Sequence, residues 1–149
     1  MSDAACLPGV LDVDDHLCFA IYSAGHAFNR IYKPLLGALD LTYPQYLVML
    51  VLWEKGSLSV KIIGEKLDLD SGTLSPLLKR LEQAGLIDRA RDPKDERQVI
   101  VSLTEKGSGI QCQVGTIMDA IGQATGCNMT EIANLRDQLQ RLKTNLAAE

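Results

Sequence analysis

Cysteine supplies the most reactive side chains in this sequence, and four of them stand at positions 6, 18, 112 and 127. Cys18 lies in an apolar segment near the start of an expected helix, just after Asp14 and Asp15. A thiol becomes nucleophilic when nearby donors or positive charge stabilise its thiolate. The helix N-terminus favours that anion, whereas the two carboxylates oppose it. The residues alone leave two interpretations open: an inert core cysteine, which is favoured, or an oxidant-reactive thiol.

Cys127 is the best candidate for a second reacting thiol. It follows Gly126 in an expected loop between the last two helices, where it could move to meet an oxidised cysteine. Cys112 falls within a helix and Cys6 in the N-terminal arm, and a spectator role stays open for Cys127 as well. Structural zinc needs four ligands at characteristic spacings, which the sequence lacks, so we expect no metal and no cofactor.

The composition is that of one globular domain, which we expect in the cytoplasm. The chain has 149 residues, 46% of them hydrophobic, and a net charge of −4. Residues 1–16 carry four acids and no lysine or arginine, the reverse of a secretory signal. No apolar run approaches the roughly 20 residues that a membrane helix needs. In a reducing cytoplasm a static disulfide framework is not expected, so any cysteine chemistry would be transient.

The N-terminal third is predicted to be a flexible arm, residues 1–11, followed by two helices. From position 17 onward the apolar residues recur at helical spacing, with Asp12 as the N-cap and Cys18 in the second turn. Pro34 is expected to kink or break this helix because proline removes a backbone donor. Thr42 and the glutamine three residues later have capping-box spacing, and they open a very apolar helix that ends near residue 54.

A helix-turn-helix pattern followed by a charged hairpin occupies the middle of the chain. Ser59 caps a short helix that ends at Leu67, and a second helix runs from about 71 to 84, with its start delayed by Pro76. Two β segments and the polar tip between them follow, at 86–89, 98–103 and 92–97. This order of elements is typical of a winged helix.

Two further helices are predicted in the last third of the chain. Thr104 caps one that runs toward Ala124, and Thr130 opens the other. Leucines at three- and four-residue steps form a seam along the last helix, which is typical of packing against a partner's helix. The fold class is therefore mainly α with a small β-wing, a winged helix-turn-helix whose N- and C-terminal helices form a dimerisation region.

One face of the second helix-turn-helix helix has the side chains that a DNA groove requires. A recognition helix buries one side and presents small or polar residues on the other. Charge supports this only weakly, because residues 55–97 carry nine basic and eight acidic side chains. An ordinary amphipathic surface helix is the alternative. The residues that we expect to contact DNA from this helix and the hairpin are Ser71, Thr73, Ser75, Lys79, Arg80 and Arg97.

Tyr32 constrains where a phenol–thiol contact can form. It lies 14 residues after Cys18 in the same expected helix, with a similar angular position. At the rise of an α-helix this separation is roughly 21 Å, so the two side chains of one straight helix cannot touch. A contact between them requires an antiparallel second copy of the chain.

Four segments of the chain resemble one family. The sequences Leu-Cys-Phe-Ala-Ile-Tyr at 17–22, Thr-Tyr-Pro-Gln-Tyr at 42–46, Leu-Asp-Ser-Gly-Thr-Leu at 69–74 and Asp-Glu-Arg at 95–97 resemble the organic-hydroperoxide-sensing branch, of OhrR type, of the MarR repressors. The similarity covers about residues 12–107. It is specific to this branch, because MarR proteins in general share the winged helix but not the first two segments.

The resemblance implies a homodimer that binds palindromic double-stranded operator DNA. Cys18 is then the peroxide-sensing thiol, and Tyr32 and Tyr43 are phenols that bond it across the dimer. Some members of this branch use one cysteine, and others resolve the sulfenic acid with a C-terminal cysteine of the partner subunit. Cys127 would fill that role, and Cys112 stays possible.

The function that we predict is a redox-sensing repressor, not an enzyme, that releases DNA when an organic hydroperoxide oxidises Cys18. Residues 12–149 form one domain, in which 12–54 and 104–149 supply dimerisation helices and 55–103 the DNA-binding lobe. Two alternatives remain: a repressor gated by a small aromatic ligand with Cys18 incidental, and a thiol peroxidase. No thioredoxin-like βαβ pattern supports the second.

Overall fold

The protein is a chain of helices with one small sheet, and the computed structural model describes residues 12–149. The predicted flexible arm, residues 1–11, and Cys6 within it lie outside the described residues. The elements are, in order, η1 (Val13–Asp15), α1 (Leu17–Gly37), α2 (Tyr43–Lys55), β1 (Leu58–Ser59), α3 (Val60–Leu67), α4 (Ser71–Gln83), β2 (Ile87–Arg91), β3 (Val99–Leu103), α5 (Glu105–Gly109), η2 (Ile110–Gln113), α6 (Val114–Thr125) and α7 (Met129–Ala147).

Helix α1 starts later along the chain, and continues further, than the sequence predicts. Asp12 caps the short 3₁₀ turn η1, through a 3.0 Å bond from the Asp14 amide, and α1 begins only at Leu17. Cys18 therefore lies in the first turn and not the second. Of the kink or break expected at Pro34, the break does not occur, because α1 continues to Gly37. The proline costs one backbone bond, which burial of the next turn against the core offsets.

Helix α2 forms the centre of the core, and its start is as predicted. The Gln45 amide donates to Thr42 Oγ1 (3.4 Å), and the Thr42 amide donates to Gln45 Oε1 (2.9 Å), which is a complete capping box. Tyr46, Met49 and Leu52 are wholly buried. α1, α3 and α4 pack around this helix, and so does the sheet through β3.

The winged helix-turn-helix is confirmed. Ser59 caps α3 and Asp70 caps α4, whose Thr73 amide donates to the Asp70 carboxylate at 2.8 Å. Pro76 does not delay the start of α4, because the Asp70 cap fixes the first turn at residue 71. The hairpin β2–β3 is joined at its other edge by the two-residue β1, which the sequence analysis missed, in the order β1-β3-β2.

The segment after the sheet is anchored by a glycine. An added Cβ at Gly107 would stand 2.0 Å from the carbonyl oxygen of Leu86, and the Trp53 indole donates to the Gly107 carbonyl at 2.9 Å. Thr104 caps α5 as predicted, but the long helix expected there is divided by the 3₁₀ segment η2. α7 begins at Met129, one residue earlier than predicted, because Asn128 and Glu131 form its capping box.

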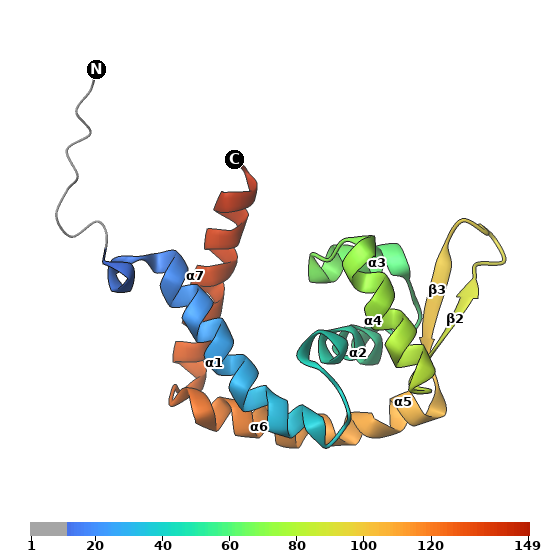
Figure 1. Ribbon diagram of the computed structural model, residues 1–149, viewed down its shortest axis with the longest axis horizontal. Helices are drawn as coiled ribbons and strands as arrows, with labels where there is room; N and C mark the ends of the chain where they lie inside the picture. Colours follow the sequence, from blue (N-terminus) through green and yellow to red (C-terminus); the bar gives the residue numbers. More distant parts are fainter. Residues whose placement is uncertain (1–11) are drawn as a thin grey trace.

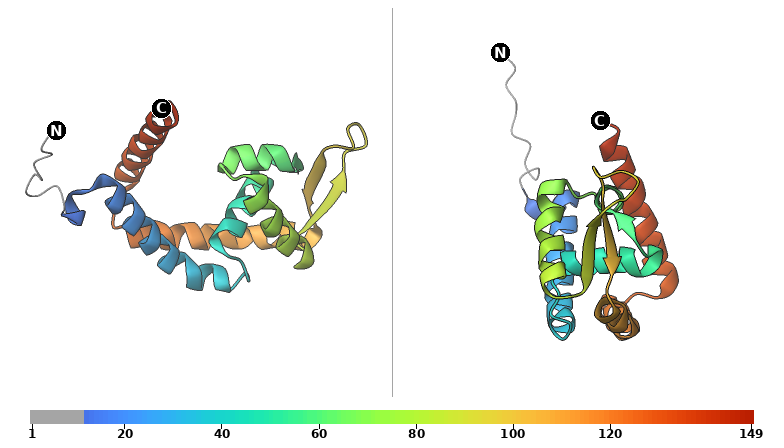
Figure 2. Two further views of the ribbon diagram at one scale, coloured as in Figure 1. Left: turned by 45° about the horizontal axis from the view of Figure 1, so that its top comes forward. Right: turned by 90° about the vertical axis from the view of Figure 1, so that its right-hand side faces the viewer.

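The elements divide into a reading lobe and a helical arm. α3, α4 and the hairpin form the reading lobe at one end, whereas α1, α6 and α7 form the arm at the other (Figures 1 and 2). The lobe shares a buried core with α2, but α7 has no buried residue. Within residues 12–149, no helix is long and apolar enough to cross a membrane.

Candidate DNA interface and thiol site

Helix α4 presents the predicted recognition face to solvent. Its inward side chains, Leu74, Leu78 and Leu81, are each 1% exposed, so the helix is fixed firmly on the lobe. The five residues predicted to face DNA are all exposed: Ser71, Thr73, Ser75, Lys79 and Arg80. Small hydroxyls near the helix N-terminus and two cations toward its end match the bonding needs of base edges and phosphates.

The cations of the lobe are not equally available for phosphate. Arg89 is held by Glu82, with bonds of 3.0 Å from Nε and 2.7 Å from Nη2 to one carboxylate oxygen. Among residues 12–149, Lys79 and Arg80 form no ion pair, so their charges face solvent. Although residues 55–97 are nearly neutral in total, Lys79 and Arg80 therefore leave two positive charges on the recognition face that are unpaired within the described part of the chain.

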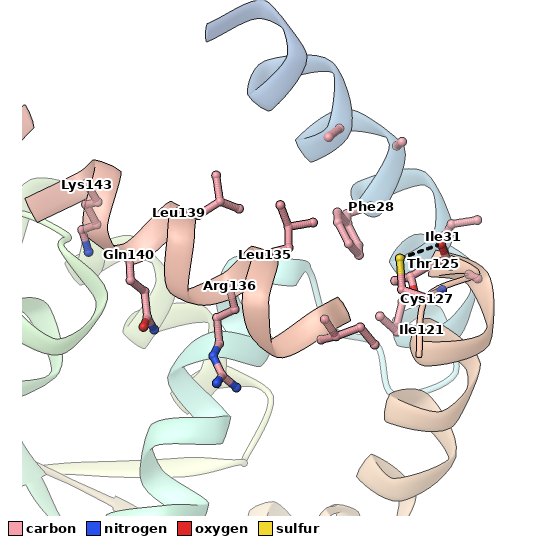
Figure 3. Close-up of a pocket in the computed structure, with 14 residues that line it drawn as sticks. Phe28, Ile31, Ile121, Thr125, Cys127, Leu135, Arg136, Leu139, Gln140 and Lys143 are labelled. Carbon is pink, nitrogen blue, oxygen red and sulfur yellow. Dashed lines mark hydrogen bonds between the residues drawn. The ribbon is translucent and has the colours of Figure 1, made fainter. Parts of the chain in front are cut away.

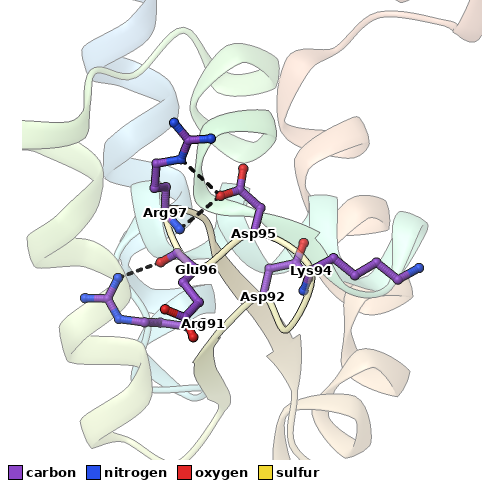
Figure 4. Close-up of polar contacts among 6 residues, drawn as sticks. All are labelled: Arg91, Asp92, Lys94, Asp95, Glu96 and Arg97. Carbon is purple, nitrogen blue, oxygen red and sulfur yellow. Dashed lines mark hydrogen bonds and ion pairs between the residues drawn. The ribbon is translucent and has the colours of Figure 1, made fainter.

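The wing tip holds Arg97 at its outer surface. The Arg97 side chain is 93% exposed, and both its Nε and its backbone amide donate to Asp95 Oδ1 at 3.2 Å. Arg91 Nη1 donates to the Glu96 carbonyl at 2.8 Å, which ties the base of the tip together (Figure 4). The tip is thus a preformed loop with an accessible guanidinium, although Asp95 competes with phosphate for it.

The thiol lies at the start of α1, whereas the two phenols predicted to bond it lie in the second half of α1 (Tyr32) and at the start of α2 (Tyr43). Cys18 is exposed in the first turn, and Tyr32 is buried four turns later. Because α1 is continuous from Leu17 to Gly37, the two residues of one chain are roughly 21 Å apart along it. The structure does bring Tyr32 and Tyr43 together, with ring centroids 4.7 Å apart.

The phenols are kept protonated by their surroundings. Burial, with smaller electrostatic contributions from the neighbouring Tyr43 and Tyr46 phenols, raises the pKa of Tyr32 to about 12. Burial also raises the pKa of Tyr43. At neutral pH both phenols therefore keep their O–H groups and act as hydrogen-bond donors, which is what a thiolate needs to be stabilised.

Tyr46 is a member of this cluster that the sequence analysis did not identify. Its ring lies 5.8 Å from that of Tyr32 and 6.4 Å from that of Tyr43, by centroids. Its three-residue spacing from Tyr43 places both on one side of α2, and that spacing was the available signal.

Cys127 and Cys112 differ in their surroundings. Cys127 is half-buried, and its Sγ lies 3.5 Å from the Thr125 carbonyl, between the end of α6 and the side of α1 that carries Phe28 and Ile31 (Figure 3). Cys112 is exposed in η2, where its Sγ donates to the Gly109 carbonyl at 3.3 Å. Among the described residues no group of histidines, cysteines and carboxylates could hold a metal ion.

An apolar groove of about 610 Å³ lies between α1, α6 and α7. Leu135 and Leu139 of α7 point toward Phe28 of α1, whereas Arg136 and Lys143 point to the other side of α7 (Figure 3). Lys143 forms an ion pair with Asp68, in the turn that precedes α4. The groove leaves large apolar side chains at the surface, since Phe28, Leu135 and Leu139 are 45%, 53% and 40% exposed.

Comparisons with known proteins agree with this architecture. The family described as transcriptional regulator SarA/Rot matches residues 30–113. The HTH-type transcriptional regulator TtmR of Methylorubrum extorquens is 52% identical over 136 residues, which cover 91% of this chain and 70% of TtmR. The organic hydroperoxide resistance transcriptional regulator of Bacillus subtilis is 53% identical over 98 residues, 66% of this chain and 67% of that protein.

Solved structures of AbfR from Staphylococcus epidermidis provide a comparison between redox states. Reduced AbfR bound to DNA superposes with a TM-score of 0.76 and 37% identity, over 89% of this chain and 90% of AbfR. Disulfide-formed AbfR superposes with a TM-score of 0.63 and 39% identity, over 85% and 88% of the two chains. The fold described above is therefore closer to the reduced, DNA-bound form.

Proposed function

Since the chain belongs to the MarR-type winged-helix transcriptional regulators, in their organic-hydroperoxide-sensing branch, we propose that it is a repressor whose hold on DNA is controlled by oxidation of Cys18. One observation carries this proposal. The exposed thiol at the start of α1 and the adjacent protonated phenols of Tyr32 and Tyr43, the first buried and the second half-buried, would form a complete site only between two subunits.

The proposed homodimer is supported by the surface of the arm. α7 has no buried residue, and apolar side chains remain exposed along α1 and α7, among them Leu17, Ile21, Phe28, Leu135 and Leu139. Contiguous apolar surface of this kind is typical of a subunit interface. An antiparallel arrangement of two α1 helices would bring each Cys18 to Tyr32 and Tyr43 of the partner subunit.

DNA binding by the reduced dimer is assigned to α4 and the wing. Ser71, Thr73, Ser75, Lys79 and Arg80 would enter the major groove, and Arg97 the minor groove. Two recognition helices related by a twofold axis read half-sites about 34–36 Å apart, which explains the palindromic operator that we propose. A change of a few ångströms in their separation is then enough to release the DNA.

The chemistry proceeds in two balanced steps. The Cys18 thiolate attacks the terminal oxygen of an organic hydroperoxide, the O–O bond breaks, and the alkoxide leaves and takes up a proton as the alcohol. The product is a sulfenic acid. The thiolate of Cys127 of the partner subunit then attacks the sulfenic sulfur, which forms the disulfide and releases water after protonation.

Movement of Cys127 would be transmitted to the reading lobe. Cys127 precedes α7 by two residues, and Lys143 of α7 is paired with Asp68 beside the recognition helix. A rigid helix of 19 residues carries a displacement at its N-terminus along its length. The chain superposes less well on disulfide-formed AbfR (TM-score 0.63) than on reduced, DNA-bound AbfR (0.76), which supports a conformational difference between these two forms of a relative.

Gel-shift binding to operator DNA tests the proposal, before and after one equivalent of cumene hydroperoxide, with non-reducing electrophoresis of the same samples. We expect loss of binding together with a dimer-sized band that dithiothreitol reverses. Cys18→Ser should retain binding in peroxide, and Cys127→Ser should abolish the band. Peroxide-driven release from Cys18→Ser would contradict the mechanism.

Loss of binding without the band would leave Cys18 as a one-cysteine sensor. A band that persists in Cys127→Ser but is lost in Cys112→Ser would transfer the resolving role to Cys112.

A second function, gating by a small aromatic ligand, is favoured by the apolar groove. PcaV of Streptomyces coelicolor in complex with its natural ligand superposes with a TM-score of 0.78 at 26% identity. A variant with all four cysteines replaced by serine discriminates between the two functions. Release of its DNA by an aromatic acid such as benzoate would support ligand gating, whereas indifference to the acid leaves the thiol mechanism.

A further inference from the structure

Tyr46 carries a buried hydroxyl that the proposed thiol chemistry does not use. The residue is wholly buried, and within residues 12–149 its Oη has no hydrogen-bond partner and is inaccessible to solvent. Its ring touches a run of aromatic side chains, with centroids 6.4 Å from Tyr43, 5.8 Å from Tyr32 and 6.3 Å from Trp53. The ring therefore lies among aromatic side chains beside the two phenols of the thiol site, and its hydroxyl is buried.

Packing does not account for this hydroxyl. A buried polar group without a partner costs stability, and a phenylalanine would fill the same space without that cost. A buried tyrosine normally finds a partner for its O–H. An unpaired hydroxyl in a core is informative, because the group has a use in a state in which an acceptor is present.

We propose that Tyr46 is a positioning residue of the thiol site, whose hydroxyl donates to the phenol oxygen of Tyr43 when Tyr43 itself donates to Cys18 of the partner subunit. This inference rests on the proposed function, in which the two subunits share each site. Tyr46 does not touch the sulfur. Its effect passes through Tyr43, which it holds in the donating orientation.

The helix geometry and the electrostatics of the pair are consistent with this arrangement. Tyr43 and Tyr46 occupy the first turn of α2 at a spacing of three residues, which brings their side chains to the same face. Burial raises the pKa of Tyr46, and the Tyr43 phenol raises it further, so Tyr46 keeps its proton at neutral pH. In a chain of O–H groups that ends on an anion, each bond polarises the next and strengthens it.

The test uses full-length protein in which Cys6, Cys112 and Cys127 are serine, so that Cys18 is the single thiol. Tyr46→Phe removes the hydroxyl and retains the ring. Two quantities are measured in the dimer: the second-order rate of oxidation by cumene hydroperoxide, and the pH profile of alkylation by iodoacetamide, which gives the pKa of Cys18. Thermal unfolding of the same samples reports stability.

We expect Tyr46→Phe to slow oxidation about threefold to tenfold, which corresponds to the loss of one ordinary hydrogen bond, and to raise the pKa of Cys18. Thermal stability should be unchanged or higher. In a Tyr43→Phe background the same substitution should add nothing to either quantity, because its effect requires the Tyr43 oxygen.

Three results would overturn the inference: an unchanged rate and pH profile in Tyr46→Phe, an effect that persists in the Tyr43→Phe background, or a slower rate explained by loss of the fold. Tyr32→Phe and Tyr43→Phe separate this failure from failure of the proposed function. If they alter the pKa of Cys18 and Tyr46→Phe does not, only the role of Tyr46 is wrong. If none of the three alters it, the contact between the phenols and the thiol is wrong.

Discussion

The reading lobe and the helical arm are built from helices of similar type, but they bury their apolar residues in different ways. In the lobe, Ile63, Leu74 and Leu78 are at most 1% exposed. In the arm, Leu135 and Leu139 of α7 remain 53% and 40% exposed although they belong to a regular leucine seam. Burial of large apolar side chains is the main favourable term in folding. The lobe gains this stabilisation within one chain, and so do α1 and α6 through Leu36 and Ile117, whereas α7 buries no residue within the chain.

On the proposed function, this difference allows one molecule to keep a rigid DNA-binding face while its sensing region changes conformation. The recognition helix keeps a fixed face because its inward leucines are fully packed. α7 can rearrange because none of its residues is buried within the subunit, whereas α1 and α6 pack against each other and contribute to the buried core. The predictions below disturb the connection between the two regions, the arm or the lobe, and each has a matched control substitution.

The largest effect is expected from Gly107→Ala, which disrupts the close contact between α5 and Leu86, where the sheet connects to the helical arm. The new methyl group would stand 2.0 Å from the Leu86 carbonyl oxygen, so the backbone must separate there. We expect a loss of about 3 kcal/mol in the free energy of unfolding, measured by urea titration. The matched control is Gly109→Ala, which meets nothing within 4 Å and should stabilise by up to about 1 kcal/mol. Equal effects of the two substitutions would disprove the close approach.

Leu139→Asp should separate the two regions by acting only on the arm. A carboxylate in the apolar groove would have to be desolvated at the subunit interface, which weakens dimerisation by roughly 100-fold or more. Sedimentation velocity should show monomers whose helical circular dichroism is retained. Gln138→Asp adds the same charge one residue away, on the exposed face of α7, and should leave the dimer intact. Dimers that survive Leu139→Asp would exclude this surface as the interface.

Arg97→Ala should affect the lobe alone, and only through charge. The substitution removes one cationic contact per subunit, so for the proposed dimer the slope of log affinity against log salt concentration should fall by about 1 per subunit, or about 2 in total, in fluorescence anisotropy titrations. Arg141→Ala removes the same charge from the exposed side of α7 and should not alter the slope. An unchanged slope for Arg97→Ala would remove the wing arginine from the DNA interface.

The smallest effect is expected in how the free energy of unfolding falls at alkaline pH. The pKa of Tyr32 is raised from 10.0 to about 12, so above pH 10 the unfolded chain loses this proton more readily than the folded one. The contribution of Tyr32 to the free energy of unfolding should therefore be constant below pH 10 and fall as pH rises from 10 to 12. Tyr32→Phe should make that fall shallower in urea titrations at pH 9, 10 and 11. Tyr22→Phe, at a residue 64% exposed, is the control and should leave the fall unchanged.

The sequence predicts those parts of the fold that local chemistry decides. Thr42, Ser59 and Thr104 were identified as caps because short polar side chains satisfy free helix amides, and all three have that role. Pro34 does not end α1, because burial of the next turn offsets one lost bond, and Pro76 does not delay α4, because the Asp70 cap fixes its first turn. β1 was missed because two residues carry no periodicity, and it exists only through its pairing with β3.

The DNA-binding face and part of the thiol site could also be predicted from local sequence patterns. The exposed face of α4 follows from helical spacing, and the spacing of Cys18 and Tyr32 along α1 follows from the rise of a helix. Tyr46 was not predictable as a partner of the phenols, because its position beside Tyr32 depends on how α1 and α2 pack. On the proposed dimer, the thiol site is completed by the second chain, whose position the periodicity of one chain does not predict.

The unbroken helix α1 has a consequence for genetics. On the proposed dimer, each sensing site takes its sulfur from one gene product and its phenols from the other. A cell that carries one Cys18→Ser allele and one Tyr32→Phe allele would assemble mixed dimers in which both defects fall in one site and the other site is intact. Two alleles that are each unresponsive alone should therefore complement one another in part.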